Sequence, residues 1–166
     1  MTRHLLLLAA AASLALSGLV PNALAQPAPP AAAPAATPPP PASPAQAVMR
    51  QINGAGRVIR TELAKDMPDM AAVKEAAVRL NTAAGKLPQV FDKPVDPASG
   101  IKSAAKPEVW SDAKGFAAAA AALQAQTAKV LQLADGGDAA GLKAQMGALN
   151  GACGTCHQTY RVAQQK

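Results

Sequence analysis

The stretch from Leu142 to Tyr160 places the tightest constraint on how this chain can fold. Its apolar and sulfur-bearing residues are separated by four, three, four, three and four positions, as Leu142, Met146, Leu149, Cys153, Cys156 and Tyr160. This is the spacing of one face of an α-helix, and Asp138 ahead of it is a typical N-cap residue. The stretch therefore predicts a long helix whose inward face carries two cysteines.

The two cysteines belong to the sequence Cys153-Gly154-Thr155-Cys156-His157, which is a C-x-x-C-H pattern. Residues three and four apart share a face of a helix, so both thiols and the imidazole lie on one side. The pattern is typical of covalent haem attachment, in which the thiols add to the vinyl groups and the imidazole can reach the iron. The predicted cofactor is one haem c, bonded to Cys153 and Cys156, with His157 as an iron ligand.

The N-terminal part of the chain predicts export and a spacer. Residues 1–25 have a charged start, an apolar run from Leu5 to Leu16 and small residues up to Ala25, which predicts a cleaved signal peptide and a periplasmic location. The apolar run is short for a membrane span, so an uncleaved anchor is the less favoured alternative. Residues 26–44 are almost wholly Pro and Ala, which predicts a disordered tether; a recognition site for another protein is the alternative.

Other interpretations of the cysteine pair are a redox dithiol, half of a zinc site and a disulfide. A redox dithiol expects a βαβ context, and a structural zinc site needs four ligands. After signal cleavage Cys153, Cys156 and His157 are the only Cys and His residues, which is too few for zinc. Without haem, the chain would be an exported helical thiol protein with a disulfide between Cys153 and Cys156.

Residues 45–166 remain for one domain, and their pattern predicts four helices and no strands. The third helix begins at Pro107, and the second stops before Leu87 because a residue before proline avoids the helical conformation. The predicted helices span residues 45–65, 70–86, 107–134 and 139–160, with a loop rich in Pro and Gly at 91–106. The expected fold class is all-α: an antiparallel four-helix bundle with a covalent haem near the C-terminus.

Charge and composition limit the partners. The formal net charge of +6 falls to +5 when Arg3 leaves with the signal peptide. Mild positive charge favours docking to an acidic redox partner, whereas export and few aromatic residues argue against nucleic acid. No pairing of a nucleophile with a base indicates hydrolase chemistry, so we expect no enzyme activity. We also expect no stable membrane insertion after signal cleavage.

The domain resembles the cytochrome c′ group of bacterial periplasmic c-type cytochromes. The resemblance is carried by three segments: Cys153–Arg161, where an aromatic and a basic residue follow C-x-x-C-H; Leu87–Phe91; and Pro107–Asp112, which contains Trp110. It implies that His157 is the proximal iron ligand. Because the group often forms dimers through its first two helices, a homodimer is a further expectation.

Members of this group differ in the residue that faces the other side of the iron. Low-spin members supply a methionine from the first helix, whereas five-coordinate members place a non-ligating apolar residue there. The segment Gln46–Gly54 is similar to the low-spin members, which implies Met49 as the distal ligand; a core methionine is the alternative. Met67, Met70 and Met146 are poorer candidates.

The distal residue separates two expected functions. With Met49 on the iron, the chain would carry electrons between periplasmic or membrane-bound redox partners, without substrate chemistry. With an open distal face, it would bind nitric oxide or carbon monoxide. Arg161 resembles the basic residue beside the proximal ligand, and Arg50 and Arg57 are candidates for pairing with the haem propionates. For all three, a solvated cation is the alternative.

Overall fold

The computed structural model describes residues 42–163. Its four long helices are α1 (Pro44–Leu63), α2 (Met70–Gly85), α5 (Ala113–Asp135) and α6 (Ala139–Tyr160). Three short elements join them: α3 (Leu87–Val90), the 3₁₀ turn η1 (Pro97–Ser99) and α4 (Glu108–Ser111). The predicted signal peptide and nearly all of the predicted tether lie outside the described residues.

Polar side chains cap the N-terminal ends of α1, α2 and α6. Ser43 Oγ accepts a hydrogen bond from the Gln46 amide at 3.1 Å, and Gln46 Oε1 accepts one from the Ser43 amide at 3.0 Å, which together form a capping box. Pro44 occupies the first turn, where its missing amide costs nothing. Asp69 and Asp138 cap α2 and α6. The first helix therefore starts one residue before the predicted domain boundary.

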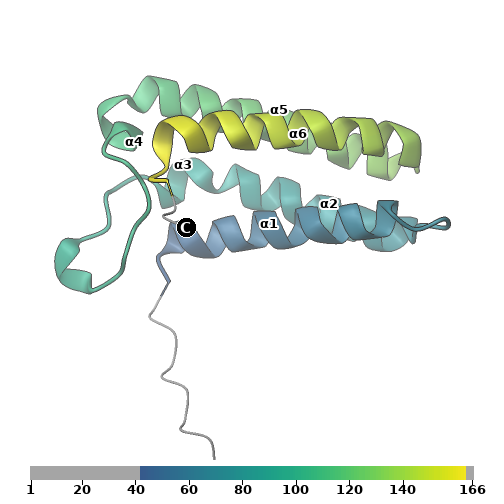
Figure 1. The fold of residues 1–166 in the computed structure, drawn as a ribbon, viewed down its shortest axis with the longest axis horizontal. Coiled ribbons are helices and arrows are strands. Elements are labelled where there is room, and N and C mark those ends of the chain that lie inside the picture. Colours follow the sequence, from purple (N-terminus) through teal and green to yellow (C-terminus); the bar gives the residue numbers. More distant parts are fainter. Residues whose placement is uncertain (1–41, 164–166) are drawn as a thin grey trace, which may run out of the picture. The chain divides into compact units, whose positions relative to one another are not determined.

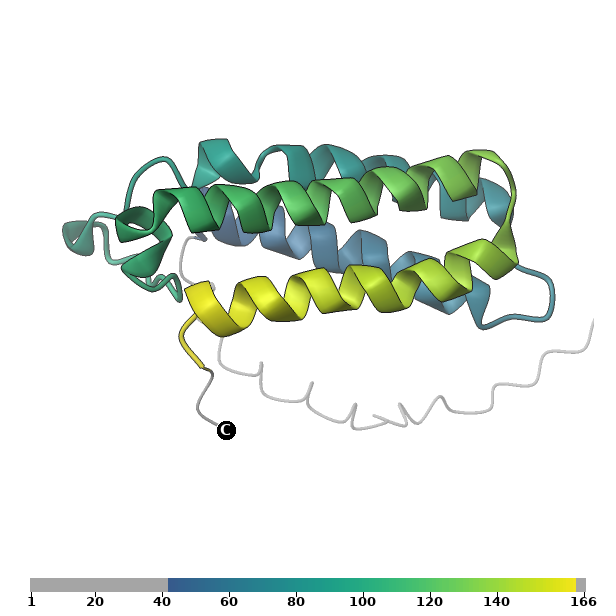
Figure 2. The same cartoon turned by 90° about the horizontal axis from the view of Figure 1, so that it is seen from above.

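The long helices form an antiparallel four-helix bundle (Figures 1 and 2), as predicted. Short turns join α1 to α2 and α5 to α6 at one end, which we call the closed end. The crossover from Phe91 to Pro107 lies at the other end, which we call the open end. Neighbouring helices pack extensively from α1 to α2, from α2 to α5 and from α5 to α6, whereas α1 and α6 make sparse contact. One side of the bundle is therefore a loose seam.

Two details of the predicted helices were wrong. The third predicted helix is broken at Asp112, which has φ −112° and ψ 56° and separates α4 from α5. The Asp112 side chain accepts a hydrogen bond from the Gly115 amide at 3.1 Å, so it caps a new helix. Leu87 is helical after all: α2 ends at Gly85, and the chain starts the short α3 with Pro88 in its first turn.

Candidate functional site

The last turns of α6 carry the three predicted haem residues at the open end. Cys153, Cys156 and His157 are all half-buried, and neither thiol takes part in a disulfide. The rest of the predicted inward stripe is buried: Leu142, Met146, Leu149 and Tyr160. The helix thus leaves both thiols and the imidazole only partly covered by the protein.

Met49 lies in the part of α1 that runs through the open end. Its side chain is half-buried and packs against the same hydrophobic core that Cys153 touches from α6. The two helices meet along the loose seam, where direct contact is sparse. The structure therefore brings Met49 and the C-x-x-C-H turn to the same end of the bundle, on helices that do not pack tightly together. Met67, in contrast, is 88% exposed in the turn at the closed end.

Burial sets the protonation of the site. It lowers the pKa of His157, and the positive charge of Arg161 lowers it further, so the imidazole is favoured in its neutral form. A neutral imidazole is the form that binds a metal. Burial raises the pKa of the Cys153 and Cys156 thiols, which favours the protonated form of each.

A cation on α1 that was not among the sequence candidates acts electrostatically on the first cysteine. The positive charge of Arg60 on α1 opposes the rise in the pKa of the Cys153 thiol. Arg60 folds back over Gly56, where a Cβ would lie 3.4 Å from Arg60 Nη1. The only signal in the sequence was the i, i+4 spacing of Gly56 and Arg60. The candidates Arg50 and Arg57 are exposed on the same helix.

An aromatic cluster anchors the end of α6. The Tyr160 hydroxyl donates a hydrogen bond to Asp112 Oδ2 at 2.7 Å, which raises the pKa of Tyr160 to about 12. The ring of Phe116 stacks edge-on against Tyr160 and Phe91, with centroid distances of 5.4 and 5.1 Å. Trp110 Nε1 donates to the Phe91 carbonyl at 2.9 Å. The segments that carried the family resemblance therefore meet around the C-terminal turn of α6.

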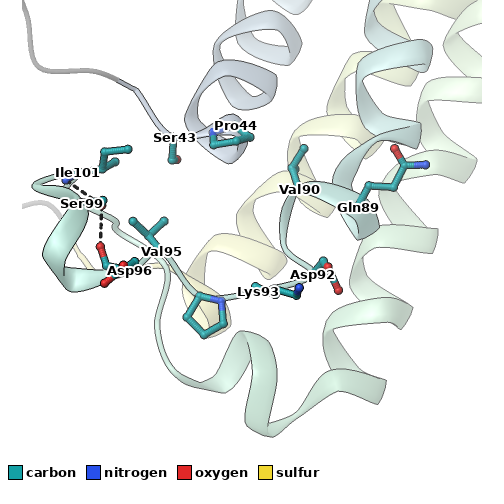
Figure 3. Close-up of a pocket in the computed structure, with 11 residues that line it drawn as sticks. Ser43, Pro44, Gln89, Val90, Asp92, Lys93, Val95, Asp96, Ser99 and Ile101 are labelled. Carbon is teal, nitrogen blue, oxygen red and sulfur yellow. Dashed lines mark hydrogen bonds between the residues drawn. The ribbon is translucent and has the colours of Figure 1, made fainter.

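A surface cavity of about 350 Å³ lies beside this end of the bundle (Figure 3). It lies between the start of α1, α3 and the crossover, and is lined by residues such as Ser43, Val90, Asp92, Lys93 and Ile101. None of the predicted haem residues lines it. The cavity is therefore separate from the C-x-x-C-H turn and does not mark the haem site.

The residues at the open end fit a covalently bound haem. Two thiols and a neutral imidazole on one helical face are the donor set that such a haem requires. The seam between α1 and α6 leaves the thiols, the imidazole and Met49 half-buried, so a large apolar plate could complete their burial. Trp110 and Phe116 at the same end are also only half-buried.

A helical bundle with C-x-x-C-H on its last helix defines a class of proteins, the four-helix-bundle cytochromes with haem c. The family profile described as Cytochrome C' matches residues 42–161, which is nearly all of the described chain. The chain belongs to the cytochrome c′ family, and haem c is its cofactor. Members of this family are electron carriers or gas-binding haem proteins.

Individual relatives agree with this assignment. Cytochrome c-556 from Agrobacterium tumefaciens (strain II Chrys) is 36% identical over 118 residues, covering 70% of this chain and 93% of the relative. Cytochrome c′ from Rubrivivax gelatinosus is 37% identical over 110 residues, covering 66% and 83%. The crystal structure of cytochrome c′ from Rubrivivax gelatinosus superposes with a TM-score of 0.61 at 29% identity, covering 70% of this chain and 91% of that one.

A further structure is that of a ferrous variant of cytochrome c′ from Alcaligenes xylosoxidans with bound NO. It is similar with a TM-score of 0.63 at 26% identity, covering 72% of this chain and 91% of that one.

In the part of the present chain that the structure describes, no helix combines the length and apolarity needed to cross a membrane.

Proposed function

We propose that this protein is a periplasmic electron carrier whose single haem c is bonded to Cys153 and Cys156, with His157 as proximal ligand and Met49 as distal ligand. One observation carries the proposal: Met49 and the C-x-x-C-H turn lie at the same end of the bundle, on two helices that pack loosely against each other. The haem supplies an iron that cycles between the ferric and ferrous states.

The residues of α6 hold the proximal side. Each thiol would add across one vinyl group, so that sulfur bonds to carbon, the thiol proton moves to the neighbouring carbon and nothing is released. Because Cys153, Cys156 and His157 share one helical face, the two bonds also fix the haem beside the imidazole. The burial that keeps His157 neutral favours it as a ligand without competition from a proton.

Met49 would close the distal side. A thioether is a soft, uncharged ligand, which stabilises reduced iron and raises the reduction potential. A bound methionine also occupies the position that a gas would take. The half-buried position of Met49 on the core-facing side of α1 supports this role.

The second candidate function is gas binding at an open distal face. It is favoured by the similarity to the Alcaligenes xylosoxidans variant that holds NO. In this case Met49 would be a core residue that packs beside the haem without binding the iron. The two functions share the proximal side and differ only in what Met49 does.

A pair of methionine variants separates the two functions. Met49→Ala should convert the reduced protein from low-spin to high-spin and allow it to bind carbon monoxide. Met67→Ala is the matched control, because this methionine is 88% exposed at the other end of the bundle. If both variants keep the wild-type spectrum, Met49 is not a ligand and gas binding becomes the better function.

Export, partners and assembly complete the proposal. The charged, apolar and small-residue segments of residues 1–25 support cleavage of a signal peptide and a periplasmic location. The net positive charge supports docking to acidic periplasmic or membrane-bound redox partners. A homodimer remains part of the proposal, to be measured by sedimentation of the holoprotein.

A further inference from the structure

A short segment of the crossover links α1 to α6 at the open end of the bundle. This segment, Lys102–Lys106, is here called the strap. At its start, Gln46 Nε2 of α1 donates a hydrogen bond to the Lys102 carbonyl at 2.7 Å. The same side chain accepts from the Ser43 amide through Oε1, so Gln46 caps α1 and holds the strap at once. Met49 follows Gln46 by one helical turn.

The other end of the strap binds the end of α6. The Val162 amide donates to the Ala104 carbonyl at 2.8 Å, and the Lys106 amide donates to the Tyr160 carbonyl at 2.9 Å. Lys106 Nζ donates to the Gln158 carbonyl at 3.1 Å. This ammonium satisfies a carbonyl of the last helical turn and lies at the negative end of the helix dipole. His157 directly precedes Gln158 in the same turn.

The remainder of the crossover supports the strap from the side of the surface cavity (Figure 3). Ser99 Oγ donates to the Asp96 carbonyl at 2.6 Å and accepts from the Ile101 amide at 3.2 Å, which orders the chain just ahead of Lys102. Because α1 and α6 make sparse direct contact, the hydrogen bonds of the strap supply a link across the seam at this end.

We infer that Gln46 and Lys106 are positioning residues: through the strap they fix the first turn of α1 relative to the last turn of α6, and thus Met49 relative to His157. This inference rests on the proposed function, in which Met49 and His157 face opposite sides of the haem. Neither Gln46 nor Lys106 needs to touch the haem for this role. Each acts through a backbone carbonyl.

Two variants of the holoprotein remove one bond at each end of the strap. Gln46→Glu keeps an oxygen that can accept from the Ser43 amide, as in an ordinary capping box, but removes the donor to Lys102. Gln51→Glu is its control, because it adds the same charge at an exposed position of α1. Lys106→Leu removes the ammonium that binds Gln158, and Lys102→Leu is its control at an exposed position of the strap.

The distal arm of the test is the loss of the low-spin spectrum of the ferrous protein in a urea titration, which reports the release of Met49 from the iron. Gln46→Glu should raise the equilibrium constant for this loss about five- to tenfold over wild type, the factor that corresponds to one lost hydrogen bond. Gln51→Glu should keep the wild-type equilibrium constant.

The proximal arm is the iron–imidazole stretching vibration, measured by resonance Raman in a ferrous Met49→Ala background. Lys106→Leu should shift this vibration, and Lys102→Leu should not. This arm does not depend on methionine ligation, so it decides the role of Lys106 even if Met49 proves not to be a ligand. If neither arm differs from its control, the inference is overturned. A response in only one arm overturns the claim that the strap couples both sides.

Discussion

The two ends of the bundle are built from the same helices but are packed differently. At the closed end, Ile59, Val73, Val130 and Leu142 are 0% exposed, one from each long helix. At the open end, Met49, Trp110, Phe116 and both cysteines are only half-buried, along with His157. The polypeptide completes its own core at the closed end. At the open end it leaves apolar surface and thiols for a cofactor to cover.

The largest expected effect comes from removing the cofactor from the open end. Cys153→Ala combined with Cys156→Ala should give a protein without covalent haem, whose mass equals that of the polypeptide alone. Because the haem would bury surface only at the open end, amide exchange should accelerate in residues 44–52 and 153–160 and much less in residues 59–63 and 130–142.

The control for this experiment is Thr155→Ala, which changes an exposed residue of the same pentapeptide and should retain the haem. Uniform acceleration of exchange along the four helices would contradict the division into two ends. A mass difference between wild type and the double variant that is no larger than the loss of two sulfur atoms would contradict covalent attachment itself.

The next effect tests the closed end. Leu142→Ala removes a side chain that is 0% exposed and should lower the free energy of unfolding by about 2–5 kcal/mol. The visible spectrum of the folded variant should stay as in wild type, because the lost packing is remote from the haem. Denaturant titration followed by circular dichroism measures the first quantity. A changed ligation state would show that the closed end also sets the haem site.

Most of the helices could be predicted from sequence because their determinants are local. The cap at Asp138, the prolines and the spacing of apolar residues predicted three of the long helices closely. The break at Asp112 was not predicted: one oxygen of its carboxylate caps α5 locally, but the other accepts a hydrogen bond from Tyr160, which is distant in the chain. The strap and the loose seam also depend on segments that are distant in the chain, so the sequence did not indicate them.

A glycine substitution tests the hydrogen bond between Tyr160 and Asp112, which anchors the end of α6. A Cβ at Gly115 would collide with the carboxylate of Asp112 and the hydroxyl of Tyr160. Gly115→Ala should therefore lower stability by about 1–2 kcal/mol, although alanine is the better helix former. Gly147→Ala is the control, because open space surrounds that position, and it should raise stability by about 0.5–1 kcal/mol. Equal effects of the two substitutions on the midpoint of urea unfolding would contradict the anchor.

The smallest expected effect is the pH dependence of the stability that the hydrogen bond between Tyr160 and Asp112 contributes. The hydrogen bond to Asp112 raises the pKa of Tyr160 to about 12, above the usual value of about 10. The contribution of the hydroxyl to stability is then fully present below about pH 10 and is lost as the pH rises toward 12. The difference in stability between wild type and Tyr160→Phe should thus be constant from neutral pH to about pH 9 and shrink above about pH 10. A difference that stays constant through pH 12 would show that the bond does not form.

The central claim is that the open end is completed by a haem with His157 on one side and Met49 on the other. It is tested most directly by the absorption spectrum of the reduced wild-type protein before and after addition of carbon monoxide. The account predicts a low-spin haem c spectrum that carbon monoxide leaves unchanged, because His157 and Met49 would both bind the iron. A high-spin spectrum that shifts on addition of carbon monoxide would contradict it.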